Sequence, residues 1–481
     1  MTTLTPALAR DIAAALRSGA VPRSGLEHFA TGLDRLLPVI EAELREVADG
    51  SGRGRSKWVR GEYGSGKTFA TRLICARARE QRFATTEVQI SINDTPLHHL
   101  ATVYRRMMER LTTAAHGEGA LRSVVDAWLY EVGEDVIRLK GVGEDDPQFS
   151  ALVDKRLEEK LAELSTRNPA FSQVLRAYNN ALQAGDFQVA QGLLAWLAGQ
   201  PHVDRSVTSR AGVRGAVDGQ AALTFLRGVL QLLRQSGYAG LVLVLDEVET
   251  IQRMQPAATR EKSLNALRQL VDMLAGDELP GLYLLVTGTP SFFDDYKGIK
   301  GLQPLYQRLA TRFDADPRHD NLRMPQVRLP AFDASRLLEV GRRVRDLFPA
   351  TASERVHTRV SDPFLAALAD KVTSGFGGRV SVCPRIFLRE LVDVLDKVDQ
   401  YEDYDPAAQY KLVLDEAALT PEELDAHHAS GAPDATSAAP RAPRTTKAPP
   451  VAAPIVTEVA PDEDENADET ATPRASIRLD G

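Results

Sequence analysis

The chain has 481 residues, of which 43% are hydrophobic, and a formal net charge of −8 at pH 7. This length allows two or three domains, and an acidic total gives no overall sign of nucleic-acid binding, although it can hide a local basic face. The two cysteines, Cys75 and Cys383, lie far apart without partners at metal spacing, which argues against disulfide and zinc frameworks. Residues 1–19 lack the apolar core of a secretory signal, and no later run reaches membrane-spanning length, so we expect a cytoplasmic protein.

Short apolar runs predict a parallel sheet after a helical segment at residues 1–55. Helical stretches separate these runs, and continuous apolar composition is typical of strands buried on both faces. The pattern predicts an α/β core of the P-loop type over residues 56–330. The expected strands are KWV at 57–59, EVQISI at 87–92, LVLVL at 241–245 and LYLLVT at 282–287, with PQVRL at 325–329 as a fifth candidate.

A long insertion is expected between the second and third strands. About 150 residues separate them, whereas a crossover needs only a dozen or so. Apolar residues at spacings of three and four predict helices over 121–139, 151–164 and 187–197. We therefore expect a mostly helical insertion at about 115–220.

Helical patterns return after Pro330 in SRLLEVGRRVRDLF, DPFLAALADKV and CPRIFLRELVDVLDKV. They predict a helical lid over residues 331–430, and a small helical lid after the sheet is the architecture of AAA+ ATPases. From about residue 431 the chain consists largely of Ala, Pro, Thr and charged residues. Such a composition buries too little apolar surface to fold, so residues 431–481 are predicted to be a disordered tail.

The stretch VRGEYGSGKTF at 59–69 has the G-x-x-x-x-G-K-[ST] spacing of a phosphate-binding loop, between a strand pattern and a helix pattern. In such a loop the glycines let backbone N–H groups curl around phosphates, Lys67 reaches the terminal phosphates, and the Thr68 hydroxyl holds Mg²⁺. The alternative is a glycine-rich turn that binds nothing.

A second motif, LVLVLDEVE, ends an apolar strand in acids. Asp246 stands where a Walker B carboxylate holds Mg²⁺, and Glu247 is placed to orient or deprotonate the attacking water. This pair favours hydrolysis over phosphoryl transfer to a metabolite, the alternative being an acidic surface turn. Glu249 either supports the site or, as the pattern favours, is a solvated surface acid. The expected nucleotide-binding residues are Gly61, Glu62, Tyr63, Gly64, Ser65, Gly66, Lys67, Thr68, Phe69 and Asp246.

Polar residues at two other strand ends are candidate sensors of the γ-phosphate or the water. In LYLLVTGTP, Thr287 is the first candidate and Thr289 the second, although a threonine can simply end a strand before a turn. Asn93, after EVQISI, could hold Glu247 inactive until a partner binds, but an ordinary turn residue is the favoured interpretation.

Arginines supply the remaining candidates. Arg308 and Arg312, four apart in PLYQRLATRF, could present a guanidinium to the γ-phosphate of a neighbouring subunit, which would imply a homo-oligomer; either could instead be a surface salt-bridge partner. Arg385 starts a predicted lid helix, where a sensor 2 arginine would reach the nucleotide, with Arg379 as competitor and a structural role as the alternative. The absence of an N-K-x-D motif favours ATP over GTP.

Three segments together resemble the BREX system ATP-binding protein family. The resemblance covers roughly residues 10–425, with the loop RGEYGSGKT and the run from VQIS through TPLH to TVYRR as its most specific parts. One departure is Ile92-Asn93 after VQIS, where an acidic residue is expected, which weakens the proposed role of Asn93. The three segments are ALRSGAVPRSGLEHFATGLDRLLPVIEAELREVADG, KWVRGEYGSGKTF and ATTEVQISINDTPLHHLATVYRRMMERL.

The resemblance implies an AAA+ type ATPase of a bacterial phage-resistance system that acts with other defence proteins, including a DNA helicase encoded beside it. We expect ATP and Mg²⁺ as cofactors, and hydrolysis that remodels or loads the helicase on DNA. Contact to DNA is either direct or through that partner. The alternative is a binding module, in which ATP locks an assembly platform and turnover is incidental. A DNA translocase lacks support, because no pore-loop signature or nucleic-acid module is present.

Overall fold

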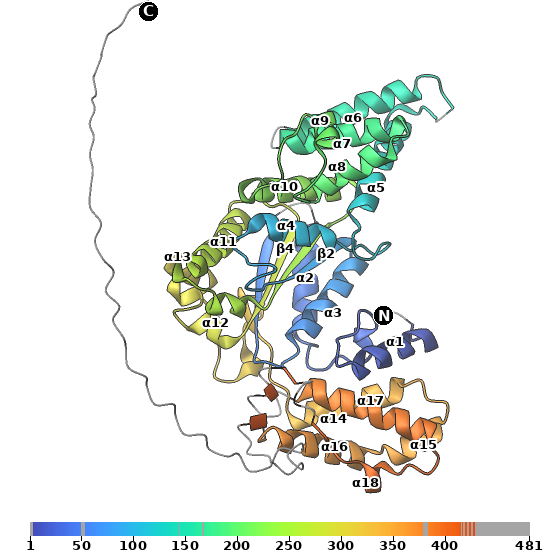
Figure 1. The fold of residues 1–481 in the computed structure, drawn as a ribbon, viewed down its shortest axis with the longest axis vertical. Coiled ribbons are helices and arrows are strands. Elements are labelled where there is room, and N and C mark those ends of the chain that lie inside the picture. Colours follow the sequence, from blue (N-terminus) through green and yellow to red (C-terminus); the bar gives the residue numbers. More distant parts are fainter. Residues whose placement is uncertain are drawn as a thin grey trace, which may run out of the picture. The chain divides into compact units, whose positions relative to one another are not determined.

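Five parallel strands form the sheet at the centre of the fold (Figure 1). Their order across the sheet is β2-β3-β4-β1-β5, so β4 lies between the strand that precedes the phosphate loop and the strand of the LDEVE motif. The strands are β1 (Arg55–Arg60), β2 (Phe83–Gln89), β3 (Gly240–Asp246), β4 (Leu282–Gly288) and β5 (Gln326–Arg328). This computed structural model describes residues 3–49, 53–143, 145–165, 168–378, 383–414, 416, 419–420, 423–424 and 427–428.

The strand β2 corrects one predicted boundary. It begins at Phe83 and ends at Gln89, whereas the sequence predicted a strand over 87–92. Ser91 explains the early end, because its Oγ accepts hydrogen bonds from the backbone N–H groups of Asp94 and Thr95, at 3.0 and 2.9 Å, and so stabilises a turn. The other four strands lie where the sequence predicted them.

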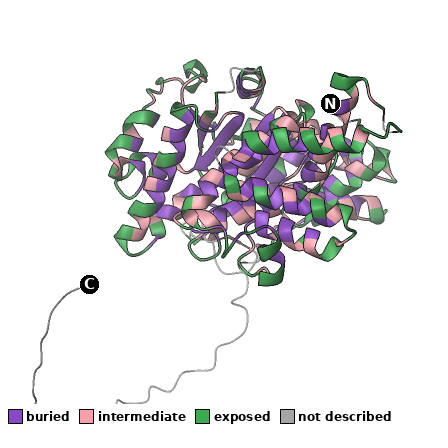
Figure 2. Ribbon diagram, turned by 90° about the horizontal axis from the view of Figure 1, so that it is seen from above, coloured by how far each residue is buried: buried purple, intermediate pink, exposed green. Residues whose placement is uncertain are grey.

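Alternation along the strands gives the sheet two apolar faces. In β3, Leu241, Leu243 and Leu245 belong to one hydrophobic cluster, and Val242 and Val244 belong to another. Successive side chains of a strand point to opposite faces, which explains this division. Figure 2 shows the strands as buried throughout much of their length. The parallel α/β architecture that the sequence predicted is therefore confirmed, and it is consistent with a P-loop NTPase-like core.

Helices cover both faces of the sheet (Figure 1). The leucine face of β3 shares its cluster with α4 (Leu100–Glu109), α10 (Gly219–Gln235) and α11 (Ala257–Ala275). The valine face shares its cluster with α2 (Leu36–Ala48) and α3 (Lys67–Glu80). The helix α3 starts at Lys67, so the phosphate-loop lysine lies in its first turn.

The segment between β2 and β3 is helical, as predicted for 121–139, 151–164 and 187–197, and its apolar residues continue the cluster on the leucine face. Side chains of Asn168, Asp186, Asp204 and Asp218 cap four of the helices by accepting backbone N–H groups, which explains where those helices begin. The helices are α5 (Leu121–Lys140), α6 (Phe149–Ser165), α7 (Pro169–Gln183), α8 (Phe187–Leu197) and α9 (Arg205–Arg210), followed by α10.

The helices at the two ends of the described chain share the cluster of the valine face. Arg17 of α1 donates from Nε to Oδ2 of Asp396 in α17 at 2.6 Å, which joins the N-terminal helix to the predicted lid. The domain boundaries remain predictions, and the predicted tail at 431–481 lies outside the described residues. These helices are α1 (Pro6–Arg17), α14 (Ala334–Leu347), α15 (Ser353–Arg359), α16 (Asp362–Gly375) and α17 (Pro384–Gln400), and the short α18 (Pro406–Gln409) follows them.

Two short helices, α12 (Pro290–Asp294) and α13 (Gln303–Leu309), connect β4 to β5. Within the part of the chain that the structure describes, no helix combines the length and the apolar composition that crossing a bilayer would require.

Candidate functional site

The phosphate-loop motif forms a tight turn between β1 and α3. Gly66 has φ of 85°, a left-handed conformation that glycine adopts without strain, and it is the residue from which α3 starts. Gly61 lies so close to Ser65 that a Cβ at this position would be 2.3 Å from the Ser65 Oγ. That Oγ is buried and has no hydrogen-bond partner among the described residues, so it is a polar group inside the loop that a ligand could satisfy.

Lys67 points back into the loop. Its Nζ donates to the carbonyl oxygens of Gly61 and Glu62, at 2.9 and 3.2 Å, and the residue is only 9% exposed. The Glu62 side chain is exposed, so this residue faces the interior only through its backbone oxygen. An ammonium held by two neutral carbonyls keeps its positive charge available for an anion.

Three of the predicted residues meet at one carboxylate. Asp246, at the end of β3, accepts a hydrogen bond on Oδ2 from the Thr68 hydroxyl at 2.9 Å and one on Oδ1 from the Thr287 hydroxyl. Asp246 is only 3% exposed. The arrangement follows from the sheet, because parallel strands end at the same edge and β4 lies beside β3. Thr289 lies elsewhere, with its Oγ1 3.0 Å from Ser291 Oγ.

Glu247 leaves the strand in a left-handed conformation, with φ of 59° and ψ of 41°. Its backbone N–H donates to Asp246 Oδ1 at 3.1 Å and to Thr287 Oγ1 at 3.3 Å, which fixes the turn. The conformation is uncommon for a residue with a side chain. It directs the carboxylate to β2, where Gln89 Nε2 donates to Glu247 Oε2 at 2.8 Å.

Gln89 makes the contact to Glu247 that the sequence analysis considered for Asn93. Because β2 ends early, Asn93 lies in the exposed turn after the strand, and Gln89 is the residue opposite Asp246 in the β2–β3 register. The idea that Asn93 contacts Glu247 is therefore wrong. The signal that could have identified Gln89 is the strand register, which requires the end of β2 to be known.

Glu249 is not the solvated surface acid that the sequence favoured. Its side chain is 18% exposed, and its Oε1 lies 3.9 Å from Lys67 Nζ. Oε2 is buried and has no hydrogen-bond partner among the described residues. Burial raises the pKa of Glu249, and the charges of Asp246 and Glu247 act in the same direction, while Lys67 opposes them. Besides the two backbone carbonyls, Lys67 therefore has the Glu249 carboxylate as a neighbour.

The chain matches the model of a known protein family. The family model of the BREX system ATP-binding protein BrxC/D matches residues 4–413. The chain belongs to this family of BREX ATP-binding proteins. The match covers the sheet, the segment between β2 and β3 and helices α14 to α18, and it confirms the resemblance that the sequence predicted over roughly residues 10–425. Comparison with curated proteins gave no match.

The two finger candidates of this BREX protein differ in their surroundings. Arg308 on α13 is paired through Nε with Asp272 of α11, and its Nη1 donates to the carbonyl oxygen of Pro304 at 2.9 Å. Arg312 lies after the end of α13, is exposed, and forms no hydrogen bond or ion pair within the described part of the chain. Of the two, Arg312 is therefore the one with an unengaged guanidinium.

The residue next to Arg312 is firmly held. The ring of Phe313 lies under two guanidiniums, with the Cζ atoms of Arg60 and Arg328 each 5.1 Å from the ring centroid. Such cation–π contacts stabilise an aromatic ring at a partly exposed position. Arg60 immediately precedes the phosphate loop, so this contact connects the loop to the segment that carries Arg312.

Arg385, the sensor 2 candidate on α17, is engaged by the end of the described chain. Its Nε donates to Oε1 of Glu423 at 2.9 Å, and its Nη2 pairs with Oε2 of the same carboxylate, which is fully buried. Glu423 and Thr420 form a reciprocal capping box, since each side chain accepts the other's backbone N–H. The competing candidate, Arg379, lies outside the described residues.

Two predicted loop residues make protein contacts. Tyr63 donates its hydroxyl to Thr420 Oγ1 at 2.8 Å, which ties the phosphate loop to the segment that engages Arg385. Phe69 packs edge to face against Phe29, with the ring centroids 5.2 Å apart. The structure therefore places Lys67, Thr68, Asp246, Glu247 and Thr287 together. Tyr63 and Phe69 instead contact other residues of the protein.

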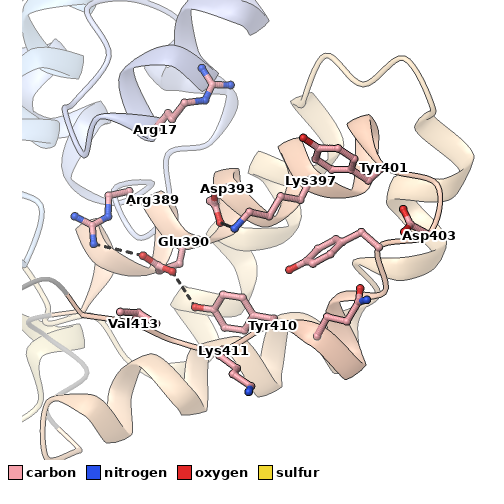
Figure 3. A pocket seen from close by; sticks show the side chains of 12 residues that line it. Arg17, Arg389, Glu390, Asp393, Lys397, Tyr401, Asp403, Tyr410, Lys411 and Val413 are labelled. Carbon is pink, nitrogen blue, oxygen red and sulfur yellow. Dashed lines mark hydrogen bonds and ion pairs between the residues drawn. The ribbon is translucent and has the colours of Figure 1, made fainter. Parts of the chain in front are cut away.

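A separate pocket of about 770 Å³ lies between α1, α17 and the segment after α17 (Figure 3). Three tyrosines line it, and the Tyr410 hydroxyl donates to Glu390 Oε2 at 3.0 Å. Burial is the main cause that raises the pKa of Tyr410. None of the phosphate-loop or LDEVE residues lines this pocket, so it is distinct from the site at the sheet edge.

Proposed function

We propose that this BREX ATP-binding protein hydrolyses ATP at the edge of its sheet, as an AAA+ type ATPase, and that it uses the hydrolysis to remodel or load a partner DNA helicase. The observation that carries the proposal is the convergence on Asp246. Thr68 of the phosphate loop and Thr287 of β4 both donate to this buried carboxylate, and the next residue, Glu247, carries a second acid at the same edge.

The residues present fit ATP with Mg²⁺. The Ser65 hydroxyl and the Lys67 ammonium are donors at the start of α3, where backbone N–H groups of a helix N-terminus also favour an anion. The Thr68 hydroxyl and the Asp246 carboxylate are neighbouring oxygen ligands of the kind that Mg²⁺ prefers. When bound, Mg²⁺ offsets the negative charge of the phosphate oxygens.

Glu247 is the proposed base. Its carboxylate is acceptor-only when ionised, and it can orient a water or take the proton that the water loses on attacking the terminal phosphorus. The Gln89 amide engages this carboxylate, so in our proposal Glu247 must leave Gln89 before it can act on the water. Thr287 contributes by fixing Asp246 and the backbone N–H of Glu247.

The order of the strands supports the AAA+ type. One additional strand, β4, separates the strand of the phosphate loop from the strand of the LDEVE motif, and the end of β4 supplies Thr287. Helices α14 to α17, which follow the sheet in the chain, correspond to the predicted lid. In this proposal Arg385 is a lid residue whose guanidinium would have to leave Glu423 to reach a nucleotide.

A homo-oligomer follows from the same proposal. Arg312 is exposed and unengaged within the described residues, and the packing of Phe313 between Arg60 and Arg328 holds the adjacent backbone. A guanidinium in this state can reach the γ-phosphate of a neighbouring copy, where it would stabilise the charge of the transition state.

The experiment that tests the proposal is phosphate release from ATP by the purified full chain and by Lys67→Ala, each with and without duplex DNA and the helicase encoded beside it. We expect release by the wild type, stimulation by the helicase, and no release above background by Lys67→Ala. Equal rates for the two proteins under all conditions would contradict the proposal that the protein hydrolyses ATP at this site. Hydrolysis that the helicase does not change would contradict only its role as the partner.

A further inference from the structure

An exposed basic turn precedes α10 in the segment between β2 and β3. It comprises α9 and the residues after it, RSVTSRAGVRG at 205–215, and it carries Arg205, Arg210 and Arg214, all exposed. None of the three forms an ion pair or a side-chain hydrogen bond within the described part of the chain. From these observations we propose that this turn binds the phosphate backbone of nucleic acid.

The turn is a built structure with a defined conformation. Asp204 caps α9 at its start by accepting the backbone N–H of Ser206 on Oδ1 at 2.7 Å. At its end, the N–H of Gly212 donates to the Ser209 oxygen and the N–H of Val213 donates to the Thr208 oxygen, at 3.1 and 3.2 Å. With Gly212 at φ of 68°, these two bonds form a Schellman motif.

Packing against α8 holds the turn in place. Val207 is buried and fits against Gly192 of α8, where a Cβ would lie 2.9 Å from Val207 Cγ1. The indole Nε1 of Trp196, also on α8, donates to the Gly215 oxygen at 2.6 Å. Figure 1 shows α9 beside α8. The backbone that carries the three arginines is therefore fixed at both ends, while their side chains lie in solvent.

The unpaired state of these arginines is unusual in this part of the molecule. The arginines of α5, α6 and α7 that the structure describes all pair with carboxylates, namely Arg122, Arg138, Arg156 and Arg176 with Asp126, Asp135, Asp135 and Glu158. Between residues 199 and 217 the only acid is Asp204, and its carboxylate caps α9. The turn thus has three positive charges and no ion-pair partner for them within the described residues.

The spacing of the charges favours a polyanion over a small anion. Arg205 and Arg210 lie at the two ends of the six-residue α9, which spans about 9 Å, and Arg214 lies beyond the Schellman turn, so the three cations are not gathered at one point. A nucleic-acid strand carries a phosphate about every 3.4 Å of its axis, which offers a partner to each of several spread cations. Arginine is also suited to phosphate, because its planar guanidinium donates two parallel hydrogen bonds.

This inference goes beyond the proposed function, and it does not depend on ATP hydrolysis, because its residues lie on a different element from the sheet edge. The net charge of −8 does not reveal this local basic surface, because acidic residues outnumber basic ones in the chain as a whole. Contacts to phosphates carry no sequence information by themselves. The proposed surface therefore binds duplex and single strands without sequence preference.

The test is the binding of the full chain to a fluorescein-labelled DNA duplex of random sequence, without ATP, over a series of salt concentrations. The variant is the triple substitution Arg205→Ala, Arg210→Ala and Arg214→Ala. Its matched control, Arg122→Ala, Lys140→Ala and Lys155→Ala, removes three exposed cations from α5 and α6. We expect the first triple to bind more weakly and to lower the slope of log K against log salt by up to about 2.7, which is three contacts at about 0.9 each. The control triple should keep the wild-type slope.

Three results would overturn the proposal: no binding by the wild type at low salt, equal weakening by the two triples, or competition by polyglutamate as strong as that by DNA at equal charge. The last would point to an acidic protein segment instead. Single-stranded DNA should lose binding in the first triple as the duplex does. If either triple melts below the wild type, Arg210→Glu against Lys155→Glu decides the matter, with loss of binding expected only for Arg210→Glu.

Discussion

Gln89, the last residue of β2, donates a hydrogen bond from Nε2 to Oε2 of Glu247 at 2.8 Å, and this contact joins two neighbouring strands at the sheet edge. The backbone of Glu247 is fixed by Asp246 and Thr287, so its side chain is the part of the residue that can change partner. In our account this contact keeps the base away from the water until a partner or a nucleotide changes it.

We expect Gln89→Ala to raise the basal rate of ATP hydrolysis. The contact is worth about 1 kcal/mol, because Gln89 is exposed and a net hydrogen bond contributes about that much. Its loss corresponds to a rise of roughly fivefold. The measurement is steady-state phosphate release, with Asn93→Ala as the control, since Asn93 lies in the exposed turn. A rate for Gln89→Ala equal to or below that of the control would show that Gln89 does not restrain Glu247.

Substitution of the two finger candidates should have unequal effects. Arg308 is already engaged by Asp272, whereas Arg312 has an unengaged guanidinium within the described residues. We expect Arg312→Ala to lower the stimulated rate of hydrolysis by roughly 10³-fold or more, the range for an arginine finger. Arg308→Ala should lower it less than about tenfold, since a surface ion pair contributes only about 1 kcal/mol.

A mixing experiment separates a finger that acts on a neighbouring subunit from one that acts within its own. Arg312→Ala retains its own Glu247, and Glu247→Gln retains its own Arg312. If the finger acts in trans, the mixture of the two variants should hydrolyse ATP faster than either alone. A mixture with only the summed rate of the two, or a particle that stays monomeric by mass with ATP, would contradict the subunit interface.

A buried charge network ties α2 to the sheet. Lys57 of β1 is only 1% exposed, and its Nζ lies 2.7 Å from Glu43 Oε1, whose other oxygen accepts the Tyr283 hydroxyl at 2.6 Å. We expect Glu43→Gln to lower the free energy of unfolding by about 3–5 kcal/mol, because it leaves a buried ammonium without its counter-charge.

The chain offers a matched control for this change. Glu46→Gln lies on the same helix and removes the partner of Arg55 on the same strand, but that pair is about half exposed. It should cost no more than about 1 kcal/mol. Urea unfolding followed by circular dichroism measures both free energies. Equal losses for the two variants would mean that burial of the network does not matter.

Asp135 of α5 gives a prediction about pH. Burial by itself would raise the pKa of Asp135, but hydrogen bonds from Lys160 and Arg156 outweigh it and lower the pKa below the ordinary 3.8. As the pH falls, the unfolded chain therefore takes up this proton before the folded chain does. The stabilisation is complete above pH 3.8 and is lost as the pH falls through the folded-state pKa.

The test is the difference in unfolding free energy between the wild type and Asp135→Asn across that range. The difference should be constant near neutral pH and should shrink below pH 3.8. Glu159→Gln is the control, because Glu159 is half exposed and pairs with the same Arg156. A difference that does not change between neutral and acid pH would contradict the role of the Asp135 carboxylate.

The sequence predicted the parts of the fold and the site that are local. The glycine spacing before Lys67 predicts the loop, and the apolar runs before Asp246 and Thr287 predict strands that end at or next to these residues, as the structure shows. The helix at 187–197 was predicted from its apolar spacing at its observed bounds, and in the structure Asp186 caps its start.

Contacts between residues that lie far apart in the chain could not be predicted from the sequence. The start of β2 was misplaced because Thr85 and Thr86 are buried strand residues with polar side chains. Its end was misplaced because the apolar pattern continues to Ile92 beyond the turn at Ser91, and Gln89 was missed with it. The partner of Arg385, Glu423, is 38 residues away in the chain, and no spacing rule connects them. The same holds for Glu249, whose burial beside Lys67 depends on how the LDEVE strand meets the loop.

Hydrolysis at the sheet edge can be measured by comparing ATP binding and single-turnover hydrolysis by the wild type and by Glu247→Gln. We expect both to bind ATP with similar affinity, since Lys67, Thr68 and Asp246 are intact, and we expect the variant to hydrolyse it at least 10²-fold more slowly, because it has lost a general base. Equal hydrolysis rates, with binding intact in both, would contradict hydrolysis at the sheet edge.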